Sequence, residues 1–168
     1  MKTPILLVTL GLFAGFLSAE PASAGEVNFV DTDNFTDFSD SYSFLERGRE
    51  SIINEITRFL ENRAESRLKA GEKLTIVITD VDMAGEFEPW RGSSAQDVRI
   101  VKDLYPPRID LSFRLTNEAG TVISEGNRKL RDMGFMYTVR ASDRDPLRYE
   151  KDLLARWLSK ELRRGSSA

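Results

Sequence analysis

Four carboxylates lie close together between residues 80 and 88, and they are the groups of this 168-residue chain most able to do chemistry. Asp80 and Asp82 follow the apolar run LTIVIT, and Glu86 and Glu88 follow a glycine. On a straight strand, Asp80 and Asp82 would project from one face about 6.6 Å apart. Inverting glycosidases hold their acid and base at a similar separation. One hypothesis is therefore a hydrolase in which Asp80 or Asp82 is the general base and Glu86 is the general acid.

A calcium site is the second chemistry that the same stretch suggests. Residues 80–85 resemble the start of an EF-hand loop, but Ala84 stands where the fifth position needs an oxygen ligand, and Arg91 stands where the twelfth needs a glutamate. Residues 31–33 begin a similar pattern, which fails at Phe35. Because neither stretch has a complete set of ligands, we expect no metal, no other cofactor, and a fold that EDTA does not weaken.

The composition excludes several classes of enzyme. The chain has no histidine and no cysteine, so it cannot build a Ser-His-Asp triad, a thiolate nucleophile or a zinc site with His or Cys ligands. Chemistry by carboxylate, Lys, Tyr or Ser groups, or by Ca²⁺ or Mg²⁺ bound through oxygen, remains. The net charge is −3 at pH 7, with acids and bases interspersed. No nucleic-acid partner is therefore expected.

The first 24 residues have the pattern of a secretory signal peptide. Lys2 precedes an apolar run from Ile5 to Leu17, and Ala22-Ser23-Ala24 is a cleavage signal of small residues. A helix of that length reaches only about 20 Å, short of the ~30 Å hydrocarbon core, which disfavours a transmembrane anchor. We expect cleavage before Gly25, a periplasmic or secreted protein, and no stable membrane insertion after cleavage.

The rest of the chain predicts a single α+β domain over residues 25–165, with a disordered tail at residues 166–168. Apolar residues at helical spacing predict two helices, at residues 44–68 and 146–165. Alternating apolar residues predict strands at residues 26–30, 74–79 and 109–116, and the hairpin turn at residues 117–120 predicts a fourth strand at residues 121–130. The order β-α-β-β-β-α favours an antiparallel-rich sheet of about four strands. Both helices would pack on one face, and the other face would be left polar.

The acidic motif conflicts with a straight strand. Asp80 and Asp82 continue the alternation of the apolar residues that face the core, so a regular strand would point both charges toward the helices. A one-residue bulge near Thr79 would instead turn Val81 and Met83 inward and the carboxylates outward.

Pairing with an arginine is the alternative to a bulge. Arg99 or Arg108 would neutralise the two carboxylates at the edge of the sheet. We favour such structural pairing over ligand binding, and ligand binding over catalysis. A buried pair at Asp82 would make Asp82→Asn lower the melting temperature by on the order of 10 °C.

Two further features have open alternatives. Trp90 could stack on a carbohydrate or on a partner protein, but the usual burial of tryptophan favours a side chain folded over the core. Met133 to Val139 is apolar and lacks helix caps, which favours a fifth short strand over an exposed docking patch.

Five segments together resemble the domain of unknown function 3016 family of secreted bacterial proteins: GEKLTIVITDVDMAGEFEP, DVRIV, PPRIDLSFRLTNEAG, KLRDMGF and LRYEKDLLARWL. The likeness covers nearly the whole chain after residue 24 and implies an exported protein with no assigned activity. Met83 stands where the family pattern has leucine, a conservative departure. By position, the resemblance marks Asp80, Asp82, Ala84, Gly85, Arg99, Arg108, Asp132, Glu150 and Trp157.

The favoured function is a non-enzymatic envelope module that binds an unknown envelope protein or glycan through the polar sheet face and the loop at residues 86–107. The alternative is the carboxylate-dependent hydrolase, acting on an envelope polymer. Arginines at salt-bridge distance from the carboxylates would support the first, and unpaired carboxylates in a concave pocket would support the second. The candidate binding or structural residues are Asp80, Asp82, Gly85, Trp90, Arg99, Arg108 and Asp132.

Overall fold

The computed structural model describes residues 24–38, 45–92, 98–138 and 144–164. The predicted signal peptide, except its last residue, and the predicted C-terminal tail lie outside these ranges, so both stay predictions. No helix within the described ranges is long and apolar enough to cross a membrane.

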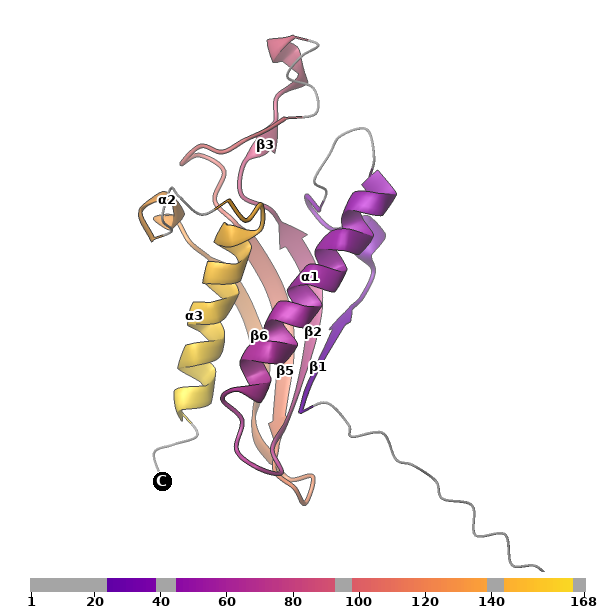
Figure 1. The fold of residues 1–168 in the computed structure, drawn as a ribbon, viewed down its shortest axis with the longest axis vertical. Coiled ribbons are helices and arrows are strands. Elements are labelled where there is room, and N and C mark those ends of the chain that lie inside the picture. Colours follow the sequence, from indigo (N-terminus) through magenta and orange to yellow (C-terminus); the bar gives the residue numbers. More distant parts are fainter. Residues whose placement is uncertain (1–23, 39–44, 93–97, 139–143, 165–168) are drawn as a thin grey trace, which may run out of the picture.

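One four-stranded sheet forms the centre of the molecule (Figure 1). Its strands are β1 (Gly25–Phe29), β2 (Lys73–Asp82), β5 (Arg108–Thr116) and β6 (Val122–Arg131). They lie in the order β1-β2-β5-β6, with β1 parallel to β2 and the other neighbours antiparallel. Two parallel strands need a crossover connection, and the helix α1 (Leu45–Glu65) supplies it.

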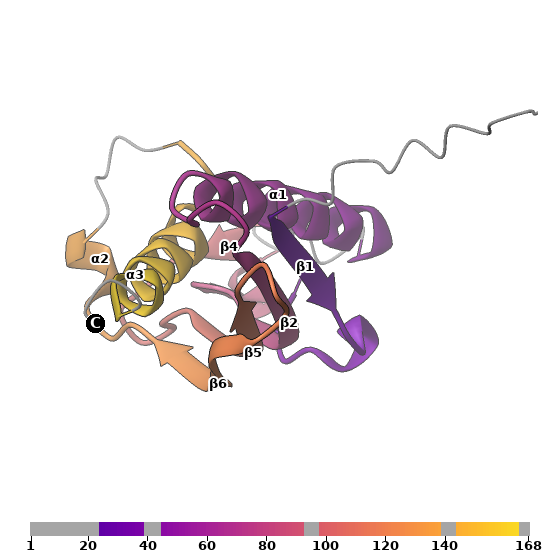
Figure 2. The same cartoon turned by 90° about the horizontal axis from the view of Figure 1, so that it is seen from below.

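Both long helices, α1 and α3 (Arg148–Arg164), cover the same face of the sheet (Figures 1 and 2). Their apolar sides bury Ile56 and Leu154 completely, and Trp157 packs edge-on against Phe113 of β5 with ring centroids 5.8 Å apart. The opposite face carries polar side chains such as Ser112. The predicted α+β layout, with two helices on one face of an antiparallel-rich sheet, is therefore confirmed.

The predicted bulge is present in β2. The register against β5 shifts between Ile78 and Asp80, which leaves Thr79 without a partner in the ladder, and its hydroxyl donates to the Asp110 carbonyl at 3.2 Å. After this shift Val81 and Met83 face the core and are buried. The bulge thus resolves the conflict between the acidic motif and the alternation of the strand.

The segment at residues 86–107, called the arm below, was expected to be irregular. Its described residues form two short antiparallel strands, β3 (Glu86–Phe87) and β4 (Arg99–Ile100), and a 3₁₀ turn, η2 (Pro89–Arg91). In Figure 1 this ribbon extends past the end of the main sheet.

The strand predicted within Met133 to Val139 is wrong, because residues 135–138 form a short helix, α2 (Phe135–Thr138). The Asp132 carboxylate accepts the Gly134 N–H at 2.9 Å and so turns the chain immediately after β6. Phe135 is buried and packs edge-on against Tyr149, with ring centroids 4.9 Å apart.

Candidate functional site

The acidic motif lies at the carboxyl end of β2, where the arm leaves the sheet, and Asp80 is fully engaged there. Its two carboxylate oxygens accept the Thr36 backbone N–H at 2.7 Å and the Thr36 hydroxyl at 2.8 Å. These two hydrogen bonds connect the segment that follows β1 to the end of β2. This arrangement gives Asp80 a structural role.

Arg99 pairs with Asp37 rather than with Asp80 or Asp82. Its two terminal nitrogens lie 2.7 and 2.8 Å from the two Asp37 oxygens, in a bidentate pair. The same guanidinium donates to the Gly85 carbonyl at 3.0 Å and lies 4.5 Å from the centre of the Phe87 ring. The Asp37–Arg99 pair therefore joins the N-terminal segment to the base of the arm.

The backbone around Asp37 extends this link. Its N–H donates to the Val81 carbonyl at 3.1 Å, and its carbonyl accepts the Met83 N–H at 3.0 Å. Asp37 is a structural residue that the sequence did not single out, since several other Asp residues stand in the same polar stretch.

Asp82 is only loosely held by the arginine that faces it across the sheet. The Arg108 guanidinium lies 3.6 Å from an Asp82 oxygen, and the two side chains are 48% and 22% exposed. Burial raises the pKa of Asp82; Arg108 lowers it, and the charges of Asp37, Asp80 and Glu86 raise it further. The net effect of these contributions is that the fold disfavours the charged form of Asp82.

A hollow of about 580 Å³ opens between the end of β2 and the arm. Asp82, Glu86 and Tyr105 contribute to its lining, together with Trp90. The Trp90 side chain is 72% exposed, so the expectation that it folds over the core is wrong. The physical reason is that the arm extends past the sheet and brings Trp90 beyond the core surface that it was expected to cover.

The arm is stiffened by a buried ion pair of its own. Glu88 is almost completely buried, and the Lys102 ammonium binds its carboxylate. The Tyr105 hydroxyl donates to the same oxygen at 3.4 Å. At the base of the arm, the Gly85 N–H donates to the Tyr105 carbonyl at 3.0 Å. The hollow is therefore bounded by side chains on a braced segment.

Glu150 joins the base of the arm to α3 from the core side. One of its oxygens accepts the Ala84 N–H at 2.7 Å, and the other has no hydrogen-bond partner within the described residues. Burial raises the pKa of Glu150, and the hydrogen bond from Ala84 opposes this effect. Glu150 was marked only by the family resemblance, and its burial places it in the core rather than in the hollow.

The sequence profile of one family, described as "Protein of unknown function (DUF3016)", matches residues 23–160. The chain belongs to the DUF3016 family. No curated protein and no solved structure matches the chain. The matched range includes every residue of the site just described, and the family description assigns no activity to the site.

One predicted site residue of this DUF3016 protein lies in a separate place. Asp132 is bound by the Arg156 guanidinium of α3 and turns the chain into α2. It contributes to neither the hollow nor the contacts of Asp80, Asp82, Arg99 and Arg108. The structure thus brings most of the predicted residues together and gives Asp132 a different role.

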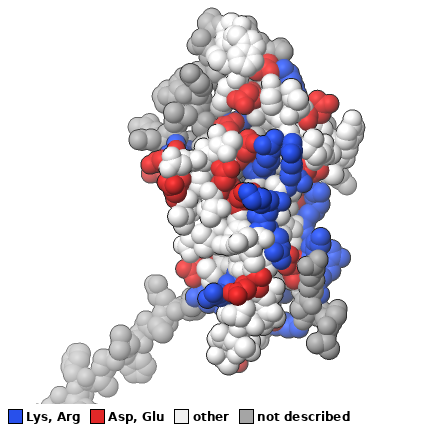
Figure 3. Space-filling view, turned by 180° about the vertical axis from the view of Figure 1, so that it is seen from behind, with Lys and Arg blue, Asp and Glu red and all other residues white. Residues whose placement is uncertain are grey.

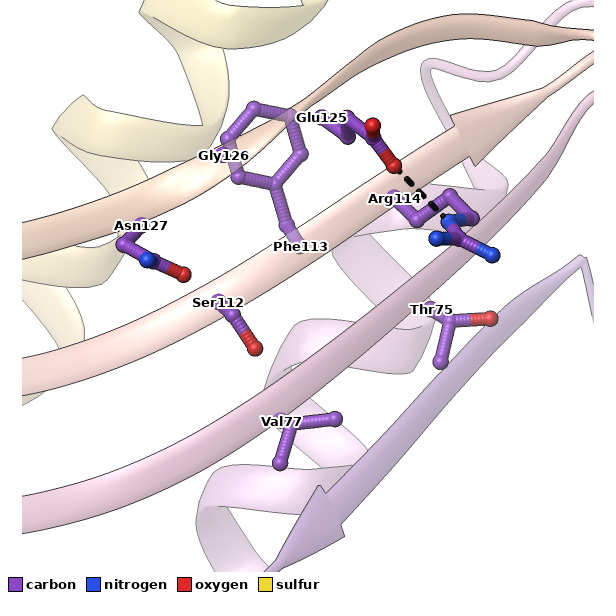
Figure 4. Close-up of a pocket in the computed structure, with 8 residues that line it drawn as sticks. All are labelled: Thr75, Val77, Ser112, Phe113, Arg114, Glu125, Gly126 and Asn127. Atoms are coloured by element: carbon purple, nitrogen blue, oxygen red, sulfur yellow. Dashed lines mark hydrogen bonds and ion pairs between the residues drawn. The ribbon is translucent and has the colours of Figure 1, made fainter.

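The polar face of the sheet has a shallow trough of about 550 Å³ (Figure 4). Short side chains, among them Thr75, Ser112 and Asn127, form its floor, and the Arg114–Glu125 pair closes one end at 3.0 Å. In Figure 3, Lys and Arg side chains form a band along this face, beside the acidic residues at its upper end. The trough is open, and Phe113, the aromatic residue in its described lining, is buried.

Within the described ranges, no group of three or more Asp or Glu side chains is arranged to hold a metal ion. The expectation that folding needs no divalent metal stays a prediction, which melting curves with and without EDTA would check.

Glu150 and Glu161 give a matched test of the buried acids of α3. Because the pKa of Glu150 is raised in the fold, the unfolded chain loses this proton first, and stability falls as pH rises above 4.5. Glutamine does not titrate and keeps the bond to Ala84. We therefore expect Glu150→Gln to melt like wild type near pH 4 and about 2–5 °C higher at pH 8.

Glu161→Gln, on the same helix, should have the opposite effect. The Glu161 carboxylate is paired with the Arg128 guanidinium at 2.9 Å, and the substitution removes the charge from a partly buried pair. We expect a loss of about 3–6 °C at pH 8. Calorimetry of both variants from pH 4 to pH 8 provides the measurement. A fall in melting temperature for Glu150→Gln at pH 8 would contradict the conclusion that burial raises the pKa of Glu150.

Proposed function

We propose that this DUF3016 protein is an exported, non-enzymatic envelope module that binds a protein or glycan partner at the hollow beside the arm. The exposed Trp90 side chain carries this proposal, since a largely exposed tryptophan at the rim of a concave surface is a common anchor for a partner. The trough on the sheet face would extend the contact surface. The pattern of the first 24 residues supports export to the periplasm.

The bracing of the arm supports binding by a preformed surface. The Asp37–Arg99 pair and the buried Glu88–Lys102 pair hold both sides of the arm. A surface that is ordered before the partner arrives loses little conformational entropy on binding, and affinity rises accordingly.

A hydrolase of an envelope polymer is the second candidate, and one observation favours it. Asp82 has a raised pKa and lines the same hollow as Glu86. A tuned carboxylate beside a second acid is an arrangement found in glycosidases. Against this reading, hydrogen bonds and ion pairs already engage the carboxylates of Asp80, Asp37 and Glu88.

A pull-down from envelope extract tests the proposal. We expect the immobilised protein to retain a component that Trp90→Ala loses. Tyr137→Ala is the matched control, because Tyr137 is 92% exposed but lies on α2, outside the hollow. Equal retention by wild type and Trp90→Ala would argue against binding at the hollow. Release of soluble sugars from peptidoglycan that Glu86→Gln abolishes would instead support the hydrolase.

A further inference from the structure

The charges that line the hollow do not balance. Among the described residues that line it, Asp37, Asp82 and Glu86 contribute carboxylates, and Arg108 contributes a positive charge. The Asp37 charge is already matched by Arg99. The carboxylates of Asp82 and Glu86 and the guanidinium of Arg108 remain, so the described lining has one negative charge in excess.

Neither of the two remaining carboxylates is tightly paired. The 3.6 Å separation of Arg108 and Asp82 exceeds the length of a hydrogen bond. Glu86 accepts the Phe87 N–H at 3.1 Å and forms no ion pair within the described part of the chain. Asp80, next to Asp82, adds a third negative charge, and its two oxygens accept hydrogen bonds from the neutral donors of Thr36. The field in the hollow is therefore negative.

The rim of the hollow is apolar and aromatic. Trp90 and Leu104 are 72% and 71% exposed, and Tyr105 is partly exposed beside them. An aromatic face attracts a cation, and an apolar rim suits the methylene stem of a long basic side chain. The same two features occur together in sites that bind lysine or arginine side chains.

We propose that the hollow binds the side chain of a lysine or arginine on an extended segment of a partner protein. This inference rests on the proposed function and names its partner chemistry. A neutral glycan would cover Asp82 and Glu86 without neutralising them, and burying an uncompensated charge is unfavourable. A basic side chain removes the excess charge when it enters. Anionic polymers are excluded by the sign of the field.

Trp90 makes the proposal measurable by fluorescence. The chain has two tryptophans, and Trp157 is buried in the core, so a ligand in the hollow changes the emission of Trp90. The probe is the peptide Gly-Lys-Gly-Lys-Gly with blocked ends, and the matched probe has norleucine in place of both lysines. We expect the norleucine peptide to bind about tenfold more weakly or not at all.

Charge-neutral variants locate the binding. Glu86→Gln and Asp82→Asn should each weaken binding of the lysine peptide by about fivefold or more. Glu125→Gln is the control, since this carboxylate is half-exposed on the sheet face, paired with Arg114, and outside the lining of the hollow. It should leave the affinity within about twofold of wild type. Melting curves establish that each variant is folded.

The outcomes separate this inference from the proposed function. Equal affinity for the two peptides, or an unchanged affinity in Glu86→Gln, overturns the basic side chain as ligand. If an N-acetylglucosamine tetrasaccharide changes Trp90 emission and the lysine peptide does not, the inference fails while a binding module stands. If neither probe binds and the pull-down retains nothing that depends on Trp90, both proposals fall.

Discussion

Asp37→Asn is expected to lower the melting temperature by about 5–10 °C. The substitution keeps the shape of the side chain but removes the counter-charge of Arg99, whose side chain is 12% exposed against 19% for Asp37. Breaking a buried pair costs about 3–5 kcal/mol, and the slight exposure of Asp37 places the loss at the lower end. In a domain of this size, about 1 kcal/mol moves the melting temperature by roughly 2–4 °C.

Asp82→Asn is the matched control, because Asp82 lies beside Asp37 in a parallel bridge between the two segments. Its pair with Arg108 is longer and more exposed, and its own pKa is raised. The charge of Asp82 is therefore unfavourable in the fold, and we expect a change of no more than about 2 °C, in either direction. Thermal denaturation of both variants at pH 7 is the measurement. A larger loss in Asp82→Asn than in Asp37→Asn would refute this assignment of the two carboxylates.

Gly85→Ala should lower the melting temperature by on the order of 10 °C. Gly85 lies between β2 and β3 and has φ at 87°. A Cβ atom at this position would lie 2.9 Å from the Ile100 carbonyl oxygen of β4. A left-handed alanine alone costs about 1–2 kcal/mol. The contact with β4 adds to this cost because the nearby atom belongs to the backbone and has little room to move. The close approach of β4 to Gly85 would be disturbed.

Gly120→Ala is the control that separates the cost of the left-handed backbone conformation from the cost of a steric contact. Gly120 has φ at 78° in the hairpin turn between β5 and β6, and a Cβ atom there would meet nothing within 4 Å. This variant therefore reports the conformational cost alone, which we expect to lower the melting temperature by about 2–5 °C. If the two variants lose the same amount, the close approach of β4 to Gly85 contributes nothing to stability.

The main sheet could be predicted because its signals are local. β5 alternates polar and apolar residues and is followed by a turn at Asn117 to Gly120 that leads into β6, and such a pattern depends on near neighbours alone. The bulge at Thr79 followed from the conflict between two charges and the alternation of the strand. Both features were inferred without knowledge of any distant residue.

The contacts of the site could not be predicted, because they join distant parts of the chain. Arg99 binds a carboxylate 62 residues away, and Asp80 binds Thr36, 44 residues away. Asp37 and Thr36, the distant partners, do not differ in their local sequence pattern from the other polar residues around them. The rule that tryptophan side chains are usually buried gave a wrong prediction for Trp90, because it does not account for a ribbon that extends past the sheet.

The helix α2 is a different case, because its signal was present in the sequence. The run Asp132-Met133-Gly134 offers an Asp side chain to an N–H two residues later, which is a turn signal. The apolar residues that follow outweighed this signal in the prediction. Greater weight on Asp132 would have predicted a turn at this point in place of a fifth strand.

The edge position of β1 has a consequence for the order of folding and opening. β5 and β6 meet across a short turn, whereas β1 reaches β2 only after the whole of α1 has been placed. β1 and β6 are both edge strands, but β1 has 5 residues and β6 has 10, so β1 should show the fastest amide hydrogen exchange in the sheet. Thr36 and Asp37, which line the hollow, follow β1 on the same segment. Local opening of that segment would therefore dismantle the hollow while β2, β5 and β6 stay folded.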